Sequence, residues 1–240
     1  IRAYAEYLFA NDYAPYTAKQ WGVSPDEIDP SVLKRVPLRF SYNEGYFDDP
    51  YQVMPQHSFT AFFENLLNHP NITVRLGVDA LHHLSVTDGI LLLDGQAAEQ
   101  TVIYTGALDE LFGCRFGRLP YRSLRFEWKY TKEESVQAAP VVAYPQEDGY
   151  TRITEYKKLP IQQGTGSSYA LEYPIAYAAD SGAEPYYPVL TEQSAAQYAQ
   201  YKALANEIPD LICCGRLADF KYYNMDQALA RALEIAAQLQ

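Results

Sequence analysis

The sequence is poor in cysteine, histidine and positive charge, and it has no long apolar run. It carries 19 Lys and Arg against 30 Asp and Glu, so its formal charge is -11. This charge argues against nucleic acid or an anionic membrane surface as a partner, since both favour a basic face. No window approaches the run of about 18 apolar residues that a membrane span needs, and no signal segment opens the chain. We therefore expect a cytoplasmic globular protein with no membrane partner.

The few cysteines and histidines also limit the possible chemistry. Cys213 and Cys214 are adjacent, and neighbours on a strand point to opposite faces, so they suit neither a shared disulfide nor a zinc site. With Cys114 they are expected to be reduced, buried thiols. None of the four histidines has metal-ligand or triad spacing, and Gly-x-Ser-x-Gly and Gly-x-Gly-x-x-Gly are both absent. No metal site is expected.

Aromatic residues are abundant instead, with 22 Tyr, 10 Phe and 2 Trp. Tyrosine combines an apolar ring with a polar tip, so it suits surfaces that stack on a sugar or base and also hydrogen-bond it. As ordinary half-buried strand residues, tyrosines would account for about half of this excess. Trp21, between Gln20 and Gly22, suits a core role and a stacking role equally.

Hydrophobic periodicity predicts mixed α and β structure. Helices are predicted at residues 1–11, 24–36, 58–67, 191–206 and 225–239. Short strands are predicted at 38–42, 72–76, 101–105 and 211–214, with a hairpin around Asp88 and Gly89. The helix at 24 rests on a capping box of Ser24 and Glu27 with Pro25 at its first position. Alternating strands at 122–130, 136–144, 151–157 and 168–173 predict an antiparallel sheet, with Leu124, Phe126, Trp128 and Tyr130 on one apolar face.

Arginines at the edges of these elements are the other candidates for binding. They are Arg35, Arg39, Arg118, Arg122, Arg152 and Arg216. Two converging guanidinium groups could hold a diphosphate on an acidic protein, although any one of them could equally form a surface ion pair. Gly215 leaves a predicted buried strand shortly before the helix at Met225, and such a helix start favours an anion or a reduced, anionic ring system.

Eight ordered sequence blocks carry a resemblance to a known family. They are Tyr-Thr-x-Lys-Gln-Trp-Gly at 16–22, Leu-Lys-Arg-x-Pro at 33–37, Tyr-Phe at 46–47, Gly-Arg-Leu-x-Tyr-Arg at 117–122, Thr-Arg-Ile-Thr-Glu at 151–155, Pro-Tyr-Tyr-Pro at 185–188, Gly-Arg-Leu at 215–217 and Tyr-Tyr-Asn-Met-Asp at 222–226. In these blocks the chain resembles bacterial UDP-galactopyranose mutase over nearly all of its length. The resemblance implies a flavoenzyme that interconverts UDP-galactopyranose and UDP-galactofuranose, a cell-surface glycan precursor, with reduced FAD as the nucleophile and no net redox change.

The resemblance also implies a set of site residues. Catalytic residues would be Arg35, Arg152, Tyr222 and Asn224. Further substrate contacts would be Tyr16, Thr17, Trp21, Tyr46, Phe47, Arg122, Glu172 and Tyr187, with Arg35 and Arg152 on the diphosphate. Cofactor contacts would be Gly215, Arg216, Tyr223, Asn224 and Met225. UDP-galactose would be the substrate and a homodimer a possible assembly.

The implied fold is α/β (mixed α+β). An incomplete Rossmann-like FAD/NAD(P)-binding portion would join a helical segment and an antiparallel-sheet substrate domain. The expected divisions are a helical, nucleotide-sugar-binding segment at 1–55, a partial FAD domain at 56–118, the sheet domain at 119–190, and a C-terminal part at 191–240 that completes the FAD domain.

The chain departs from the family pattern in two ways. Asn224 stands where the family has an aspartate. Its amide keeps the ability to hydrogen-bond but lacks the charge of a carboxylate. The Gly-rich βαβ turn that would hold the FAD pyrophosphate is absent. We therefore expect this chain to be a fragment that binds FAD poorly and is inactive alone. The alternatives are a non-catalytic nucleotide-sugar-binding remnant and a structural fragment with an exposed apolar face.

Overall fold

The computed structural model describes residues 1–33, 42, 48–179 and 181–239. Several sequence predictions fall outside this described part: Arg35, Arg39, Tyr46, Phe47, the end of the helix predicted at 24–36 and nearly all of the strand predicted at 38–42. The chain forms two compact units. Unit 1 comprises residues 1–16, 34–78 and 126–173, and unit 2 comprises residues 17–33, 79–125 and 174–240. The four-part division expected from the sequence stays a prediction.

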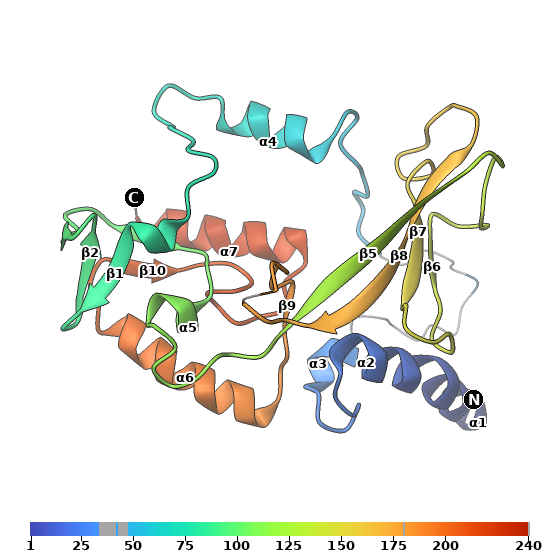
Figure 1. The fold of residues 1–240 in the computed structure, drawn as a ribbon, viewed down its shortest axis with the longest axis horizontal. Helices are drawn as coiled ribbons and strands as arrows, with labels where there is room; N and C mark the ends of the chain where they lie inside the picture. The colour runs from blue at the N-terminus through green and yellow to red at the C-terminus, as the bar shows by residue number, and fades with distance from the viewer. Residues whose placement is uncertain (34–41, 43–47, 180, 240) are drawn as a thin grey trace. The chain divides into compact units, whose positions relative to one another are not determined.

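The helices agree largely with the periodicity (Figure 1). The first helical stretch runs through α1 (Arg2–Leu8), a π-helical turn η1 (Phe9–Tyr13) and α2 (Ala14–Trp21). The others are α3 (Pro30–Leu33), α4 (Phe59–Leu67), the 3₁₀ turn η2 (Ala80–His82), α5 (Leu108–Leu111), α6 (Glu192–Asn206) and α7 (Met225–Gln238). The predicted α4, α6 and α7 are confirmed, with Ser58 and Thr191 as N-caps whose hydroxyl groups accept main-chain N–H groups.

The strands of the described residues form three sheets. A small meander contains β1 (Leu84–Thr87), β2 (Ile90–Leu93) and β3 (Gln96–Ala97), a parallel pair contains β4 (Val102–Tyr104) and β10 (Leu211–Cys213), and the largest sheet has the order β6-β7-β8-β5-β9. Its strands are β5 (Tyr121–Thr131), β6 (Val141–Ala143), β7 (Arg152–Glu155), β8 (Ser167–Ala176) and β9 (Tyr187–Pro188). The antiparallel pairing predicted for β6, β7 and β8 is confirmed. So is the hairpin at Asp88 and Gly89, where both residues have positive φ.

Three predictions of local structure are wrong. Residues 25–27 form a turn, and the helix begins only at Pro30, because a proline restricts the residue before it and has no N–H to continue an earlier helix. Residues 72–76 form no strand. The strand predicted at 136–144 is only Val141–Ala143.

The two faces of β5 also differ from the sequence prediction. Ser123 is fully buried, whereas Trp128 and Tyr130 at the far end of the supposed inner face are each 65% exposed. Trp128 stacks on Tyr156 of unit 1, with ring centroids 5.2 Å apart and planes 25° apart. The apolar alternation therefore does not define one buried face along the whole strand.

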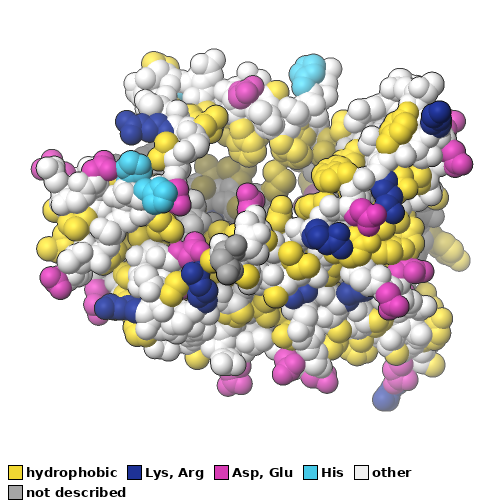
Figure 2. Space-filling model, in the orientation of Figure 1, with side chains coloured by type: hydrophobic (Ala, Val, Ile, Leu, Met, Phe, Trp, Pro, Cys, Tyr) yellow, Lys and Arg dark blue, Asp and Glu magenta, His cyan; other side chains and the backbone are white. Residues whose placement is uncertain are grey.

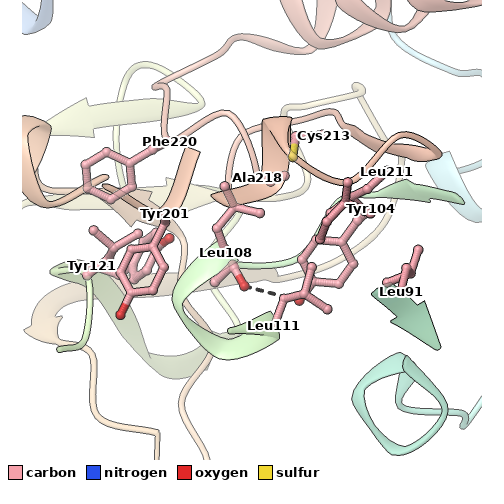
Figure 3. Close-up of a cluster of buried hydrophobic side chains, with 14 residues drawn as sticks. Leu91, Tyr104, Leu108, Leu111, Tyr121, Tyr201, Leu211, Cys213, Ala218 and Phe220 are labelled. Carbon is pink, nitrogen blue, oxygen red and sulfur yellow. Dashed lines mark hydrogen bonds between the residues drawn. The ribbon is translucent and has the colours of Figure 1, made fainter. Parts of the chain in front are cut away.

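The main core lies in unit 2, around β4, β10, α5 and α6 (Figure 3). Leu108, Tyr201 and Ala218 are fully buried there, and Figure 1 shows β10 between α6 and α7. Cys213 and Cys214 are buried and Cys114 is half-buried, and all three are free thiols. Burial raises the pKa of each thiol, so they remain protonated and act as small apolar residues.

Unit 1 contains a fully buried carboxylate, Glu155. Its Oε1 accepts a hydrogen bond from Ser167 Oγ at 2.6 Å, and its Oε2 accepts one from Ser135 Oγ at 3.1 Å. Lys158 Nζ lies 3.2 Å from Oε2, and the main-chain N–H of Val136 also donates to this carboxylate. Burial alone would raise the pKa of Glu155, but these donors together lower it to about 2.

The depressed pKa predicts acid-sensitive stability. A folded-state pKa of about 2, against a usual value of 4.5, stabilises the fold above pH 4.5, and this stabilisation is lost as the pH falls towards 2. Glu155→Gln should be less stable than the parent at pH 7, and its free energy of unfolding should change less between pH 5 and pH 2. Urea unfolding at several pH values measures this. Glu133→Gln, at an exposed position, is the control and should follow the parent.

Candidate functional site

Three predicted site residues from distant parts of the sequence meet in unit 2. The Trp21 and Tyr222 ring centroids are 5.0 Å apart, those of Tyr187 and Tyr222 are 5.0 Å apart, and those of Trp21 and Tyr187 are 5.9 Å apart. All three contacts are edge-to-face, with interplanar angles of 85°, 90° and 61°. We call Trp21, Tyr187 and Tyr222 the aromatic cluster. Trp21 and Tyr187 are buried and Tyr222 is half-buried, so Tyr222 is the member most accessible to a ligand.

The guanidinium of Arg216 holds this cluster from one side. Its Cζ lies 5.3 Å from the ring centroids of both Tyr187 and Tyr222, within the range of a cation–π contact. Arg216 Nη1 donates to the carbonyl of Tyr186 at 3.1 Å, and Nη2 donates to the carbonyl of Tyr223. The sequence assigned Arg216 to a cofactor. That role stays a prediction; in the structure the guanidinium joins the segment before β9 to the segment before α7.

Arg122 positions the other end of the cluster. Its Nε donates to the carbonyl of Gln20 at 3.0 Å and its Nη2 to that of Lys19 at 3.4 Å, so the guanidinium caps the C-terminus of α2 beside Trp21. Burial lowers the pKa of Arg122 without neutralising it. Two of the guanidinium nitrogens of Arg122 thus bind main-chain carbonyls. The contact with substrate that the resemblance implies for Arg122 stays a prediction.

Gly22 completes this cap and gives a testable prediction. Its φ is +69°, its N–H donates to the carbonyl of Ala18 at 2.9 Å, and a Cβ at this position would lie 2.8 Å from Arg122 Nη1. Gly22→Ala should therefore destabilise unit 2 by about 1–2 kcal/mol, from the left-handed backbone and the displaced guanidinium. Urea unfolding followed by Trp21 fluorescence in a Trp128→Phe background measures the change. Gly95→Ala, also at positive φ but with open space around its Cβ position, separates the backbone cost from the clash.

Two other predicted site residues form an ion pair in unit 1. Arg152 and Glu172 are directly opposite each other on β7 and β8, and Arg152 Nε lies 2.6 Å from Glu172 Oε2. Thr154 Oγ1 donates to Glu172 Oε1 at 2.9 Å, so the carboxylate is held by the same face of β7. The Arg152 side chain is 35% exposed and that of Glu172 only 5%. Glu172 thus orients a guanidinium whose outer part reaches solvent.

The predicted cofactor residues surround the start of α7. The Gly215 N–H donates to Asp219 Oδ2 at 3.1 Å, so this glycine closes the loop after β10. Asn224 is the N-cap of α7, and its main-chain N–H donates to Gln227 Oε1 at 2.8 Å. Met225 is exposed in the first helical turn. Asn224 and Gln227 therefore cap the start of α7, and the cofactor role of this set stays a prediction.

Sequence reasoning missed Asp219, which organises this loop. Asp219 is buried, and its Oδ2 also accepts from Tyr223 Oη at 3.4 Å and lies 3.4 Å from Arg231 Nε. Burial and the neighbouring Asp219 carboxylate raise the pKa of Tyr223. An aspartate four residues after a loop glycine was the only available sequence signal. A cavity of about 610 Å³ opens beside it, lined by Tyr198, Lys202, Asp219, Lys221, Tyr223, Gln227, Ala230, Arg231 and Glu234.

The remaining predicted residues are Tyr16 and Thr17. Tyr16 is half-buried in unit 1, and Thr17 is buried in unit 2, one helical turn before Trp21. Within the described ranges, no three or more His, Cys, Asp and Glu residues are grouped as metal ligands. Across the same residues, no helix has both the length and the apolar character needed to cross a bilayer.

Comparison with known proteins identifies relatives for nearly the whole chain. A family described as UDP-galactopyranose mutase matches residues 11–222. The UDP-galactopyranose mutase of Mycoplasma pneumoniae is 40% identical over 240 residues, which cover 98% of this chain and 60% of that protein. The dTDP-fucopyranose mutase of Escherichia coli is 36% identical, covering 98% and 61%, and a probable UDP-galactopyranose mutase of Klebsiella pneumoniae is 34% identical, covering 98% and 58%. The chain thus spans about 60% of the length of these relatives.

Proposed function

The chain belongs to the UDP-galactopyranose mutase family, and from this membership we propose that it provides the sugar-nucleotide-binding part of a flavin-dependent mutase. The reaction would interconvert the pyranose and furanose forms of UDP-galactose. The observation that carries this proposal is the aromatic cluster, because Trp21, Tyr187 and Tyr222 come from three separate family blocks and meet within contact distance.

The residues of the site have roles in binding and orientation. Tyr222, the half-buried member of the cluster, would offer a ring edge and a hydroxyl to the sugar nucleotide. Arg152, held by Glu172, would contribute positive charge to the diphosphate, and Arg35 is proposed for the same role although it lies outside the described residues. No histidine is needed in this scheme, since positioning and charge stabilisation are what the protein would supply.

We also propose that FAD is the cofactor, as in the flavoenzymes of this family. Tyr223, Asn224 and Met225, around the N-terminus of the 14-residue α7, would hold one end of it. When bound, reduced FAD would supply the nucleophilic centre of the reaction. Gly215 and Arg216 would fix the shape of the loop before α7, because the Gly215 N–H donates to Asp219 and the Arg216 guanidinium donates to two main-chain carbonyls. The amide of Asn224 would contact this end of the site without a charge.

Calorimetric titration with UDP tests the binding part of this proposal. We expect a dissociation constant in the micromolar range, and we expect Tyr222→Ala to weaken it about tenfold, a change of about 1.4 kcal/mol. Tyr51→Ala, at a tyrosine that is 87% exposed, is the matched control and should bind like the parent. No heat of binding at millimolar UDP would contradict the proposal.

A second sugar nucleotide has specific support. The dTDP-fucopyranose mutase of Escherichia coli is 36% identical to this chain, close to the 40% of the Mycoplasma pneumoniae relative. Parallel titrations with UDP-galactose and dTDP-fucose distinguish the two. We expect tighter binding of UDP-galactose, and a preference for the deoxy sugar nucleotide would reassign the substrate.

A further inference from the structure

The pair of Arg152 and Glu172 belongs to a longer hydrogen-bond network in unit 1. Thr154 lies two residues after Arg152 on β7, so both side chains are on the same face of the strand. Thr154 Oγ1 donates to Glu172 Oε1 at 2.9 Å, and Arg152 Nε donates to the other oxygen, Oε2, at 2.6 Å. The Glu172 side chain is only 5% exposed, so these bonds form in surroundings of low dielectric constant. Thr154 is therefore linked to the guanidinium of Arg152 through one buried carboxylate.

Thr154 occupies a fixed position in the sheet. It pairs with Val141 of β6 on one side and with Ala170 of β8 on the other. Because a β-branched side chain has a restricted χ1, its hydroxyl has few possible positions. The main chain of Glu172 is fixed as well, since the N–H of the fully buried Thr151 donates to its carbonyl at 2.9 Å. The network thus begins in a part of the sheet whose main chain is paired on both sides.

The Thr154 hydroxyl decides which oxygen of Glu172 meets Arg152. The terminal torsion of a glutamate is broad, so a carboxylate with a single partner can rotate. Thr154 holds Oε1, and this leaves Oε2 for the guanidinium. Burial and then the charge of Glu172 raise the pKa of Tyr156, whose ring is stacked on that of Trp128 at 5.2 Å. The Tyr156 ring therefore lies near the carboxylate and reduces its contact with water.

The direction of the Arg152 guanidinium matters more to an anion than its charge. The protein carries a formal charge of -11, and Figure 2 shows Lys and Arg side chains scattered with Asp and Glu side chains among them. The charge of Arg152 is itself largely balanced by Glu172 at 2.6 Å. What the guanidinium can add is directed hydrogen bonding. Fixing its orientation before the ligand arrives lowers the entropy cost of binding.

We propose that Thr154 is a positioning residue, which orients the guanidinium of Arg152 for a diphosphate by fixing the carboxylate of Glu172. The inference rests on the proposed function, because it takes Arg152 as the group that contacts the diphosphate. Thr154 acts through Glu172 and does not itself touch the ligand.

Replacing Thr154 with valine tests this role, because valine keeps the shape of the side chain and suits a strand at least as well. We expect Thr154→Val to weaken UDP binding about fivefold, the usual effect of one hydrogen bond. Thr154→Ser keeps the hydroxyl and should restore the parental affinity. Uridine has no phosphate, so its affinity, measured by ligand-observed NMR, should be the same for Thr154→Val and the parent.

Thr131→Val is the matched control. The Thr131 hydroxyl lies on β5 in the same unit and accepts the N–H of Glu133 at 3.2 Å. This variant also loses one hydrogen-bonding hydroxyl, and it should bind UDP like the parent. An equal loss of UDP affinity in Thr131→Val, or a loss of uridine affinity in Thr154→Val, would indicate a general structural effect and overturn the proposal.

A double variant tests whether Thr154 acts through Glu172. In a Glu172→Leu background the threonine has no carboxylate to fix, so Thr154→Val/Glu172→Leu should bind UDP with the same affinity as Glu172→Leu. A further fall in the double variant would mean that Thr154 acts by another route, and it would overturn the proposal.

A measurement without ligand separates this inference from the proposed function. NMR can follow the exchange of the Arg152 Nε–H with water, with the signal assigned from its absence in Arg152→Met. We expect this exchange to be several-fold faster in Thr154→Val than in the parent. If it is faster but the parent does not bind UDP, Thr154 orients Arg152 and the proposed function is wrong. If the parent binds UDP but Thr154→Val changes neither exchange nor affinity, this inference alone is overturned.

Discussion

Replacing Arg152 with methionine should destabilise unit 1 by about 3 kcal/mol, because it leaves a buried carboxylate without its counter-charge. Glu172 has a side chain that is only 5% exposed and lies 2.6 Å from Arg152 Nε. We expect the lower end of the usual range because the Arg152 side chain is 35% exposed, and because Thr154 still donates to Glu172. Urea unfolding followed by Trp128 fluorescence measures the loss. A Trp21→Phe background makes this signal specific to unit 1.

A double variant separates the stability of this pair from its role in binding. Arg152→Met/Glu172→Gln removes both charges and keeps an acceptor for Thr154, so it should recover about half of the lost stability, roughly 1.5 kcal/mol. Its affinity for UDP should stay at least tenfold below that of the parent, because the guanidinium is still missing. If the double variant bound UDP with parental affinity, Arg152 would not be part of the UDP-binding site. Arg2→Met, at an exposed pair with Glu6, should change neither quantity measurably.

The sequence predicted those parts of the fold that local patterns determine. The helices that follow Ser58 and Thr191 and the turn at Asp88 and Gly89 each depend on a short stretch of sequence: both helices have a hydroxyl N-cap, and both turn residues have positive φ. The strand predicted at 72–76 was wrong for the opposite reason. A strand forms only when a neighbouring strand pairs with it, and an alternating sequence does not show whether such a neighbour is present. The capping signal at Ser24 was real, since its N–H donates to Glu27, but Pro30 limits it to a turn.

The structure brings some of the predicted site residues together, and their roles stay predictions. Trp21, Tyr187 and Tyr222 were named from family blocks, and the structure brings them together. Arg122 and Arg216 were named as ligand contacts, and these roles stay predictions; the structure adds that both side chains donate to main-chain carbonyls beside the cluster. Burial and hydrogen-bond partners decide whether an arginine serves a ligand or the protein, and neither can be read from one sequence. Asp219 and Glu155 were missed for the same reason.

Replacing Tyr201 with alanine should cause the largest loss of stability in unit 2, about 3–5 kcal/mol. Tyr201 is fully buried in the main core (Figure 3), and its ring centroid lies 5.1 Å from that of Phe116 and 6.3 Å from that of Phe112. Truncation would leave a cavity among these rings. It would also leave the N–H of Phe116 and the carbonyl of Gly117 without the tyrosine hydroxyl, which bonds them at 2.9 Å and 2.6 Å.

Tyr201→Phe divides this loss into its two causes. The phenylalanine keeps the ring contacts and removes only the hydroxyl. It should cost about 1 kcal/mol, the usual net contribution of a hydrogen bond, because Phe116 and Gly117 are exposed and water can replace the hydroxyl. Unfolding followed by Trp21 fluorescence in a Trp128→Phe background reports on unit 2. A loss below about 1.5 kcal/mol for Tyr201→Ala would mean that the core closes around the cavity. Tyr201 is not part of the aromatic cluster, so either variant should bind UDP with parental affinity under conditions where it is fully folded. A fall in affinity for Tyr201→Phe would instead show that the core and the aromatic cluster are coupled.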